Sequence, residues 1–240
     1  MRAARGLAGL LGAWLVLGAV PPAAAGVFTI SPVRLHMGPR DRAVAVALSN
    51  DGDSLLVLQA DLFAWAQDGE GTDVLTPTDD LVLSPPIVKL APGTRQVVRL
   101  AMVVPRDAVR QMTYRLVMRE VPEALPAVPG VSMPVALAMS LPVFVTPRAA
   151  RREVHCELQR SGPQVQARCE NRGSAYAQLR ELRLVRDGSP VARFEGGAYV
   201  LPGAARAIAL RGEADLASGP AQLVLLFDDG TQRTDDLALP

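Results

Sequence analysis

Side chains that could act as nucleophiles or general bases are scarce in this chain. Its 240 residues include two histidines, His36 and His155, and two cysteines, Cys156 and Cys169. A serine nucleophile needs a histidine held between two partners, and neither histidine lies in a nucleophile elbow or an HExxH motif. The sequence also has no cluster of zinc ligands and no Gly-rich phosphate loop. We therefore expect no enzyme, no metal site and no cofactor.

The two cysteines suit a structural disulfide. Between them, Ser161-Gly162-Pro163-Gln164 indicates the turn of a β-hairpin. A turn centred between Gly162 and Pro163 places Cys156 directly opposite Cys169, close enough to bridge. A redox centre fits less well, because twelve residues separate the cysteines, whereas oxidoreductases use the CxxC spacing.

A second kind of chemistry, recognition by apolar side chains, is indicated between Val131 and Val145. Every second residue there is a large aliphatic, and the residues between them are nearly all small. The row consists of Val131, Met133, Val135, Leu137, Met139, Leu141, Val143 and Val145. A period of two is typical of a β-strand, whose side chains point alternately to two faces.

This run is about three times the usual strand length of roughly five residues, and it carries no charge. One interpretation is a long core strand of an antiparallel sandwich. The other is that part of the apolar row binds another protein, which the missing charges favour because an exposed apolar edge would otherwise aggregate.

Two prolines, Pro134 and Pro142, stand at even positions of the run. Alternate residues of a strand direct their N–H and C=O groups toward opposite edges, so both missing donors fall on one edge. The edge formed by the odd residues keeps all its donors. The sequence leaves open which edge faces the strand's own sheet.

Residues 1–25 have the composition of a secretory signal peptide. A basic start precedes an uncharged apolar stretch, Leu7 to Val20, and Ala23-Ala24-Ala25 offers a small-residue cleavage site. Pro21-Pro22 end the apolar stretch short of the about 20 residues that a membrane span requires. We expect cleavage after Ala25, export, and a mature chain that is not embedded in a membrane.

The mature chain is nearly neutral. The whole chain has a formal net charge of +1, and residues 1–25 contain two arginines and no acid, so 23 basic and 24 acidic residues remain. This balance provides no basic footprint for nucleic acid or an anionic membrane.

Both halves of the mature chain consist of short alternating segments divided by turn signals, without long helical periodicity. Candidate strands of the first half are 27–37, 43–50, 54–67, 87–90, 95–103, 114–121 and 131–145. Those of the second half are 153–160, 164–171, 178–186, 191–194, 205–211, 221–227 and 231–239. Pro202-Gly203 before a strand repeats Pro92-Gly93 before a strand.

Seven strands in about 120 residues are typical of an immunoglobulin-like sandwich. We therefore predict an all-β chain with two immunoglobulin-like β-sandwich domains in tandem. The first domain spans residues 26–147 and the second spans residues 148–240.

Four segments of the first domain occur in a specific order and combination. They are Ser31-Pro32-Val33-Arg34, the stretch from Pro85 to Arg99, the stretch from Tyr114 to Pro122, and the alternating run that closes at Phe144-Val145-Thr146-Pro147. Together they resemble the periplasmic chaperones of the chaperone–usher pilus pathway. The stretch from Ser140 to Phe144 is most similar to the archaic, spore-coat-U-like branch, and the second domain matches only in size, β character and its Asp228-Asp229-Gly230 turn.

The resemblance implies a periplasmic chaperone that lends a strand to an incomplete pilin subunit and delivers it to an outer-membrane usher. The donor-strand side chains would be Val131, Met133, Val135, Leu137 and Met139. Each large aliphatic side chain contributes about 1.5–3 kcal/mol when fully buried. Four or five of them can therefore offset an association entropy of several kcal/mol.

The resemblance also implies a basic pair in the cleft between the domains, which grips the C-terminal carboxylate of the client. Arg34 matches the first member, and the planar fork of arginine suits a carboxylate. The second member is normally a lysine late in the donor strand, but this chain has Pro142 there. Either Arg34 acts alone, or another basic residue, Arg99 or Lys89, takes over.

The alternative function is a secreted immunoglobulin-like structural or binding module, such as a pilus or surface component. A pilin should begin with a free apolar extension and lack one strand, whereas the long alternating run here precedes a second domain. The sequence leaves open which pilin subunits are clients, which face meets the usher, and whether the free protein self-associates.

Overall fold

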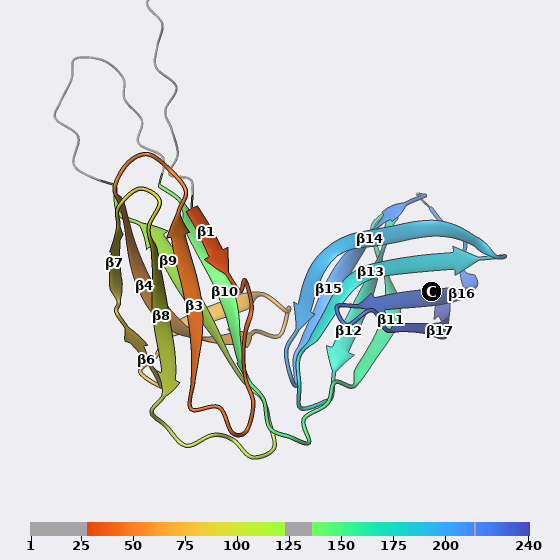
Figure 1. Ribbon diagram of the computed structural model, residues 1–240. Helices are drawn as coiled ribbons and strands as arrows, with labels where there is room; N and C mark the ends of the chain where they lie inside the picture. The colour runs from red at the N-terminus through yellow and green to blue at the C-terminus, as the bar shows by residue number, and fades with distance from the viewer. Residues whose placement is uncertain (1–27, 123–135, 214) are drawn as a thin grey trace, which may run out of the picture.

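The computed structural model describes residues 28–122, 136–213 and 215–240. Strands β1 to β10 lie between Phe28 and Val145, and strands β11 to β17 lie between Val154 and Leu239. Figure 1 shows the two groups as separate sandwiches side by side, which confirms the prediction of an all-β chain with two immunoglobulin-like domains. Within the described ranges, no helix has the length and apolar character to span a bilayer.

The first domain packs two sheets face to face. One sheet has the spatial order β1 (Phe28–Ser31), β3 (Ala43–Asn50), β8 (Arg95–Met102) and β6 (Leu81–Ser84). The other has the order β2 (Leu35–Met37), β10 (Ala138–Val145), β9 (Met112–Glu120), β4 (Leu56–Gln67) and β5 (Asp73–Pro77), and β7 (Ile87–Leu90) also pairs with β4.

The period-two pattern of β9 illustrates how these strands form a core. Tyr114, Leu116 and Met118 are buried between the two sheets. Because side chains alternate across a strand, Thr113 and Arg115 lie on the opposite, outer face. That outer face is directed toward the second domain.

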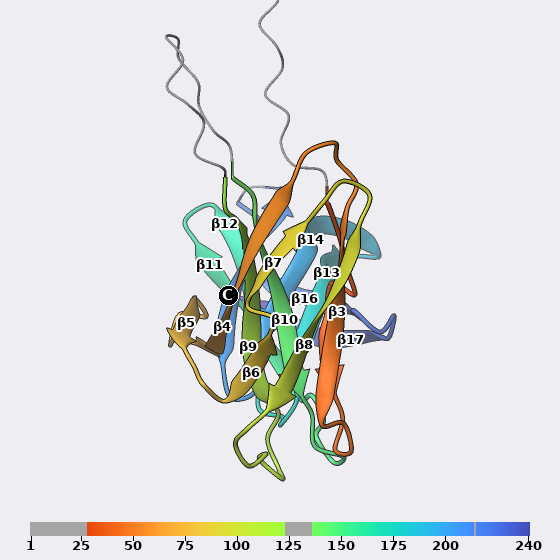
Figure 2. The same ribbon diagram turned by 60° about the vertical axis from the view of Figure 1, so that its left-hand side comes forward.

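The segment 27–37, predicted as one strand, forms two. β1 and β2 belong to different sheets, and Ser31-Pro32-Val33-Arg34 connects them. Pro32 cannot donate to a ladder, so the chain changes sheet at this point. The prediction also missed β5 and β6. β5 is a short strand at the edge of its sheet, beside β4 (Figure 2). All five of its residues are exposed, so no alternation of apolar residues marks it.

In the second domain the strand order is β11 (Val154–Ser161), β12 (Gln164–Asn171), β15 (Ala205–Gly212), β14 (Ser189–Val200), β13 (Ala177–Arg186), β16 (Gly219–Phe227) and β17 (Gln232–Leu239). The β11–β12 hairpin has the predicted register, with Cys156 opposite Cys169. The two cysteines form a disulfide, as predicted.

An apolar and hydrogen-bonded junction joins the two domains. The Phe144 ring stacks on the Tyr176 ring with 3.9 Å between centroids. Gln67, at the end of β4, accepts a hydrogen bond from Leu201 N at 2.9 Å and donates one to Tyr199 O at 3.0 Å. Gly71 lies so close to the second domain that an added Cβ would be 2.6 Å from Ala205 O. The β4–β5 hairpin is therefore packed tightly against β15.

Candidate functional site

Strand β10 divides the alternating apolar row into a buried part and an exposed part. Leu141, Val143 and Val145 belong to the core of the first domain. Leu137 and Met139, at the other end, are each 37% exposed. The first three members of the row, Val131, Met133 and Val135, lie outside the described residues. The core interpretation therefore holds for residues 141–145. At the other end, the apolar side chains of Leu137 and Met139 lie outside the core.

The odd residues of this strand direct their main-chain groups toward β9. Glu120 N donates a hydrogen bond of 2.8 Å to Leu137 O, whereas Thr146 N, at an even position, donates one of 2.9 Å to Met37 O of β2. By alternation, the edge that contains Pro142 is the one away from β9. β2 pairs with residues 143–145 alone, so among the described strands none pairs with residues 138–141 on that edge. This answers the question that the two prolines left open.

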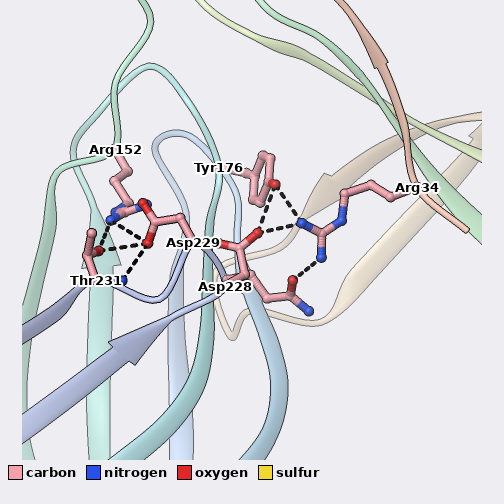
Figure 3. A network of polar contacts seen from close by, with 7 residues as sticks. Arg34, Arg152, Tyr176, Asp228, Asp229 and Thr231 are labelled. Carbon is pink, nitrogen blue, oxygen red and sulfur yellow. Dashed lines mark hydrogen bonds and ion pairs between the residues drawn. The ribbon is translucent and has the colours of Figure 1, made fainter. Parts of the chain in front are cut away.

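Arg34 reaches across the gap between the domains. Its Nη1 donates hydrogen bonds to Asp228 Oδ2 at 2.5 Å and to the Tyr176 hydroxyl at 3.0 Å, and its Nη2 donates to Gln178 Oε1. The Tyr176 hydroxyl in turn donates to Asp228 Oδ2 at 3.1 Å. Figure 3 shows this network, with Arg34 entering from the first domain and its partners from the second. The guanidinium is thus a partly buried cation already facing one carboxylate.

The protonation states in this network follow from burial and charge. Burial by itself would lower the pKa of Arg34, but the nearby Tyr199, Tyr176 and Asp228 outweigh it and raise that pKa above its ordinary value. Burial, together with Asp228, raises the pKa of Tyr176 to about 12. At neutral pH the Tyr176 hydroxyl is therefore protonated, and its O–H donates a hydrogen bond to Asp228.

A second arginine, Arg115, lines the same gap. It lies on β9 directly opposite Pro142 of β10. Its guanidinium carbon is 3.7 Å from the centroid of the Trp65 ring, and its Nη2 is 3.6 Å from Asp73 Oδ2. The Tyr199 ring connects the two arginines, since its centroid is 5.6 Å from the guanidinium carbon of Arg115 and 5.8 Å from that of Arg34. The two cations thus adjoin one aromatic ring between the domains.

A strand that is core at one end and exposed at the other, beside two arginines at the junction of two immunoglobulin-like domains, agrees with one family. Residues 27–151 match the family model described as pili and flagellar-assembly chaperone, PapD N-terminal domain. The match covers more than half of the chain. The chain belongs to this family of pilus-assembly chaperones. No protein of curated function matches the chaperone.

Solved structures share the fold of this chaperone over both domains. The complex of the CsuC chaperone with the CsuE tip subunit, from archaic Csu pili of Acinetobacter baumannii, contains a chain that is 21% identical to it, with a TM-score of 0.67. That similarity covers 88% of this chain and 98% of the other. The CupB2 chaperone of Pseudomonas aeruginosa is 18% identical, covers 88% of this chain and all of its own, and has a TM-score of 0.56.

A third structure, the complex of the SafA pilin of Salmonella enterica with the SafB chaperone, contains a chain that is 14% identical. It covers 91% of this chain and 99% of its own, with a TM-score of 0.61. At such identities the likeness establishes the fold.

The other basic candidates of the chaperone lie elsewhere. Arg99 is exposed on β8, in the sheet that does not contain β10, and Lys89 is exposed on β7. The structure does not bring either of them to Arg34. Arg115 was missed because its position depends on the β9–β10 register, which places it opposite Pro142. The sequence contains the arginine but no signal for that pairing.

The two histidines of the chaperone lie in different domains. His36, on β2, packs beside Phe144 with 5.5 Å between ring centroids, and beside Tyr176 at 6.3 Å. Burial and the charge of Arg34 lower its pKa, so it is uncharged at neutral pH. His155 lies on β11, with its Nε2 3.4 Å from Glu153 Oε1. Within the described part of the chain, no group of three His, Cys, Asp or Glu residues could hold a metal ion.

Arg152, in the linker between the two domains, makes its own contacts with the second domain. Arg152 Nη1 donates to Asp229 Oδ2 at 2.8 Å, and Thr231 donates to the other oxygen of the same carboxylate at 2.7 Å (Figure 3). These hydrogen bonds hold the pKa of Asp229 well below its usual range. The adjacent acids therefore have different partners: Asp229 holds the linker, and Asp228 faces Arg34.

Proposed function

We propose that this chaperone binds an incomplete pilin sandwich by donor-strand complementation. The observation that carries the proposal is the transition along β10, from a core strand to an apolar row that leaves the core beside an unpaired edge. An added strand obtains affinity from main-chain hydrogen bonds and specificity from alternate side chains. Leu137 and Met139 would fill the client's groove, together with Val131, Met133 and Val135.

We also propose that Arg34 and Arg115 anchor the C-terminal carboxylate of the client. Arg115 replaces Arg99 in this assignment, because Arg99 is exposed on the opposite sheet. Arg34 already pairs with Asp228 Oδ2 at 2.5 Å, so the client's carboxylate would share this guanidinium or displace Asp228 from it. A partly buried cation also binds an anion more strongly than a solvated one does. The side chain of Arg34 is 27% exposed, and that of Arg115 is 14% exposed.

The proposal includes export to the periplasm after cleavage at residue 25, and delivery of the client to an outer-membrane usher. Its support is the charge and hydropathy pattern of residues 1–25 and membership of the chaperone family. The disulfide agrees with an oxidising compartment.

Co-expression with the pilin subunits encoded beside this chaperone tests the proposal. We expect the wild-type protein to co-purify with one subunit per chaperone. Leu137→Asp should reduce the recovered complex at least about 100-fold, because it places a charge in an apolar groove. Val82→Asp is the matched control, because Val82 is also exposed but lies on β6 in the other sheet.

The anchor is tested in the same assay. Arg34→Ala and Arg115→Ala should each weaken the complex about 10-fold, and Arg99→Ala should leave it unchanged. If Leu137→Asp captures subunits as well as Val82→Asp does, donor-strand complementation by this row is wrong. A protein that polymerises on its own would instead support the surface-module alternative.

A further inference from the structure

Asp228 contacts the guanidinium of Arg34 through a single carboxylate oxygen. Its Oδ2 accepts from Arg34 Nη1 at 2.5 Å and from the Tyr176 hydroxyl at 3.1 Å (Figure 3). The other terminal nitrogen of Arg34, Nη2, donates to Gln178 Oε1 instead. A carboxylate binds arginine most strongly through two parallel hydrogen bonds, one from each of two nitrogens. The contact between Arg34 and Asp228 is therefore a weaker form of the contact that the anchor would make with a client.

The anchor is already neutralised in the free protein. Arg34 pairs with Asp228, and Arg115 pairs with Asp73 at 3.6 Å, so the carboxylate of a client would be a third anion beside two cations. Carboxylates beside one cation repel each other, and the repulsion is stronger where they are partly removed from water. The side chain of Asp228 is only 11% exposed. Displacement of Asp228 is therefore favoured over sharing of Arg34.

A place for the displaced carboxylate adjoins Asp228. It is a cavity of about 720 Å³ on the second domain, lined by residues 180–181, 195–196, 226–228 and 230. Two of the acids in its wall have partners, since Glu181 pairs with Arg183 and Glu195 pairs with Arg193, each at 3.1 Å. Arg180 is exposed and makes no ion pair with any residue that the structure describes. The cavity thus offers Asp228 a second cation.

A β-bulge brings Arg180 to this cavity. Leu179 of β13 pairs with Phe227 of β16, and Glu181 pairs with Leu226, so Arg180 is an extra residue between two paired positions. Bulges re-aim a side chain and are common beside functional sites. Asp228 directly follows Phe227, and its N–H donates to Gln178 O at 3.1 Å. The backbone of Asp228 is therefore held, and rotation of the side chain alone can turn its carboxylate from Arg34 toward the cavity.

We propose that Asp228 is an internal competitor for the anchor, which the C-terminal carboxylate of the client displaces toward Arg180. This inference rests on the proposed function, because it concerns the same guanidinium. A site that is occupied in the free protein binds its ligand with an affinity reduced by the fraction of molecules in which it is free. Asp228 thus keeps small free carboxylates off Arg34, whereas a client that also pairs with β10 has the additional affinity to displace it.

Competition between two chaperones for one client measures the effect of Asp228. Wild-type protein and Asp228→Asn, each with its own affinity tag, are produced at equal levels with a limiting amount of the pilin subunit encoded beside this chaperone. Asparagine keeps the size of the side chain and removes its charge, so Asp228→Asn should hold at least about 10-fold more subunit than the wild type. Asp236→Asn is the matched control and should share the subunit equally, because Asp236 lies on β17 and accepts from Gln222.

Arg180→Ala tests the second position of the carboxylate and changes only an exposed side chain. It should hold about 3-fold less subunit than the wild type, because the displaced Asp228 loses its new partner. In the Asp228→Asn background the same change should have no effect, since no charge is then displaced. A merely structural role of Arg180 in the bulge would lower capture in both backgrounds.

The inference is overturned if Asp228→Asn holds no more subunit than the wild type, if Arg180→Ala shares the subunit equally with the wild type, or if its loss persists in Asp228→Asn. Arg34→Ala separates this inference from the proposed anchor. If Arg34→Ala weakens capture and Asp228→Asn does not strengthen it, the anchor stands and the internal competitor is wrong. If Arg34→Ala leaves capture unchanged, the anchor itself is wrong, and donor-strand pairing is still judged by Leu137→Asp.

Discussion

The two domains share one corner and differ at their edges. In the first domain, the Asn50 side chain donates to Ser54 O at 2.8 Å and to Leu90 O at 2.9 Å, and accepts from Gly52 N at 3.0 Å. In the second, the Asn171 side chain donates to Ala175 O and Val200 O and accepts from Gly173 N, at the same three distances.

The resemblance of the two corners extends to the backbone. Gly93 N donates to Asn50 O at 2.9 Å, and Gly203 N donates to Asn171 O at 2.7 Å. Each glycine follows a proline and has a positive φ, 69° at Gly93 and 73° at Gly203, which favours glycine. The repeated Pro-Gly pair in the sequence thus marks one structural unit used twice.

The edges of the two domains differ, and the proposed donor strand lies at an edge of the first domain. Among the described strands of the first domain, none pairs with the outer edge of β10 beside Leu137 and Met139. In the second domain a disulfide joins β11 to β12, and β14 pairs with β15 at only two described positions. The corner is therefore common to both domains, whereas the proposed pilin-binding edge lies on β10 of the first domain.

Removing the disulfide should have the largest effect on stability, and the loss should be confined to the second domain. The double variant Cys156→Ser with Cys169→Ser is expected to lose about 3 kcal/mol of the free energy of unfolding, because the reduced chain gains conformational freedom when unfolded. Urea unfolding with hydrogen exchange resolved by residue measures it, and protection should fall in residues 154–239. An equal loss of protection in β1 to β10 would contradict this confinement.

The shared corner gives a matched pair of variants. Asn50→Ala and Asn171→Ala should each cost about 2 kcal/mol, because each leaves two carbonyls and at least one N–H without their side-chain partner. Asn171 Oδ1 also accepts a second hydrogen bond, from Glu153 N at 3.2 Å. The free energy of unfolding from urea titration tests this equality. Two costs that differ by more than about 1.5 kcal/mol would mean that the corners are similar in geometry and different in energetic role.

The smallest expected effect concerns His36 at the domain junction. Its pKa is lower in the folded protein than in the unfolded chain, so the folded state resists its protonation. The associated stability is fully present above the unfolded pKa of about 6.5 and decreases as the pH falls through the lower folded value. Trp65, the only tryptophan after residue 25, lies in the apolar cluster at this junction.

Trp65 fluorescence should therefore report looser packing of the junction as the pH falls below about 6.5. His36→Gln should remove most of this change, while the His155→Gln control should keep it. A transition that is identical in both variants would exclude His36 as its source.

Local patterns were sufficient for part of this protein. The hairpin register of Cys156 and Cys169 follows from a turn within fourteen residues, and the sequence predicted it correctly. The alternating row ending at Val145 was recognised as a strand because its period of two is a local property. The position of Leu141, where the row changes from exposed to buried, could not be predicted, since it depends on where the opposing sheet ends.

The sequence by itself determined the all-β class, the two sandwiches and the disulfide, because strand period and turn chemistry act over a few residues. Only the tertiary structure decided that Arg34 faces Asp228, that Arg115 stands opposite Pro142, and that β14 separates from β15. Those contacts join residues far apart in the chain, including Arg34 with Asp228 across two domains. They depend on strand register and domain packing, which no local pattern encodes.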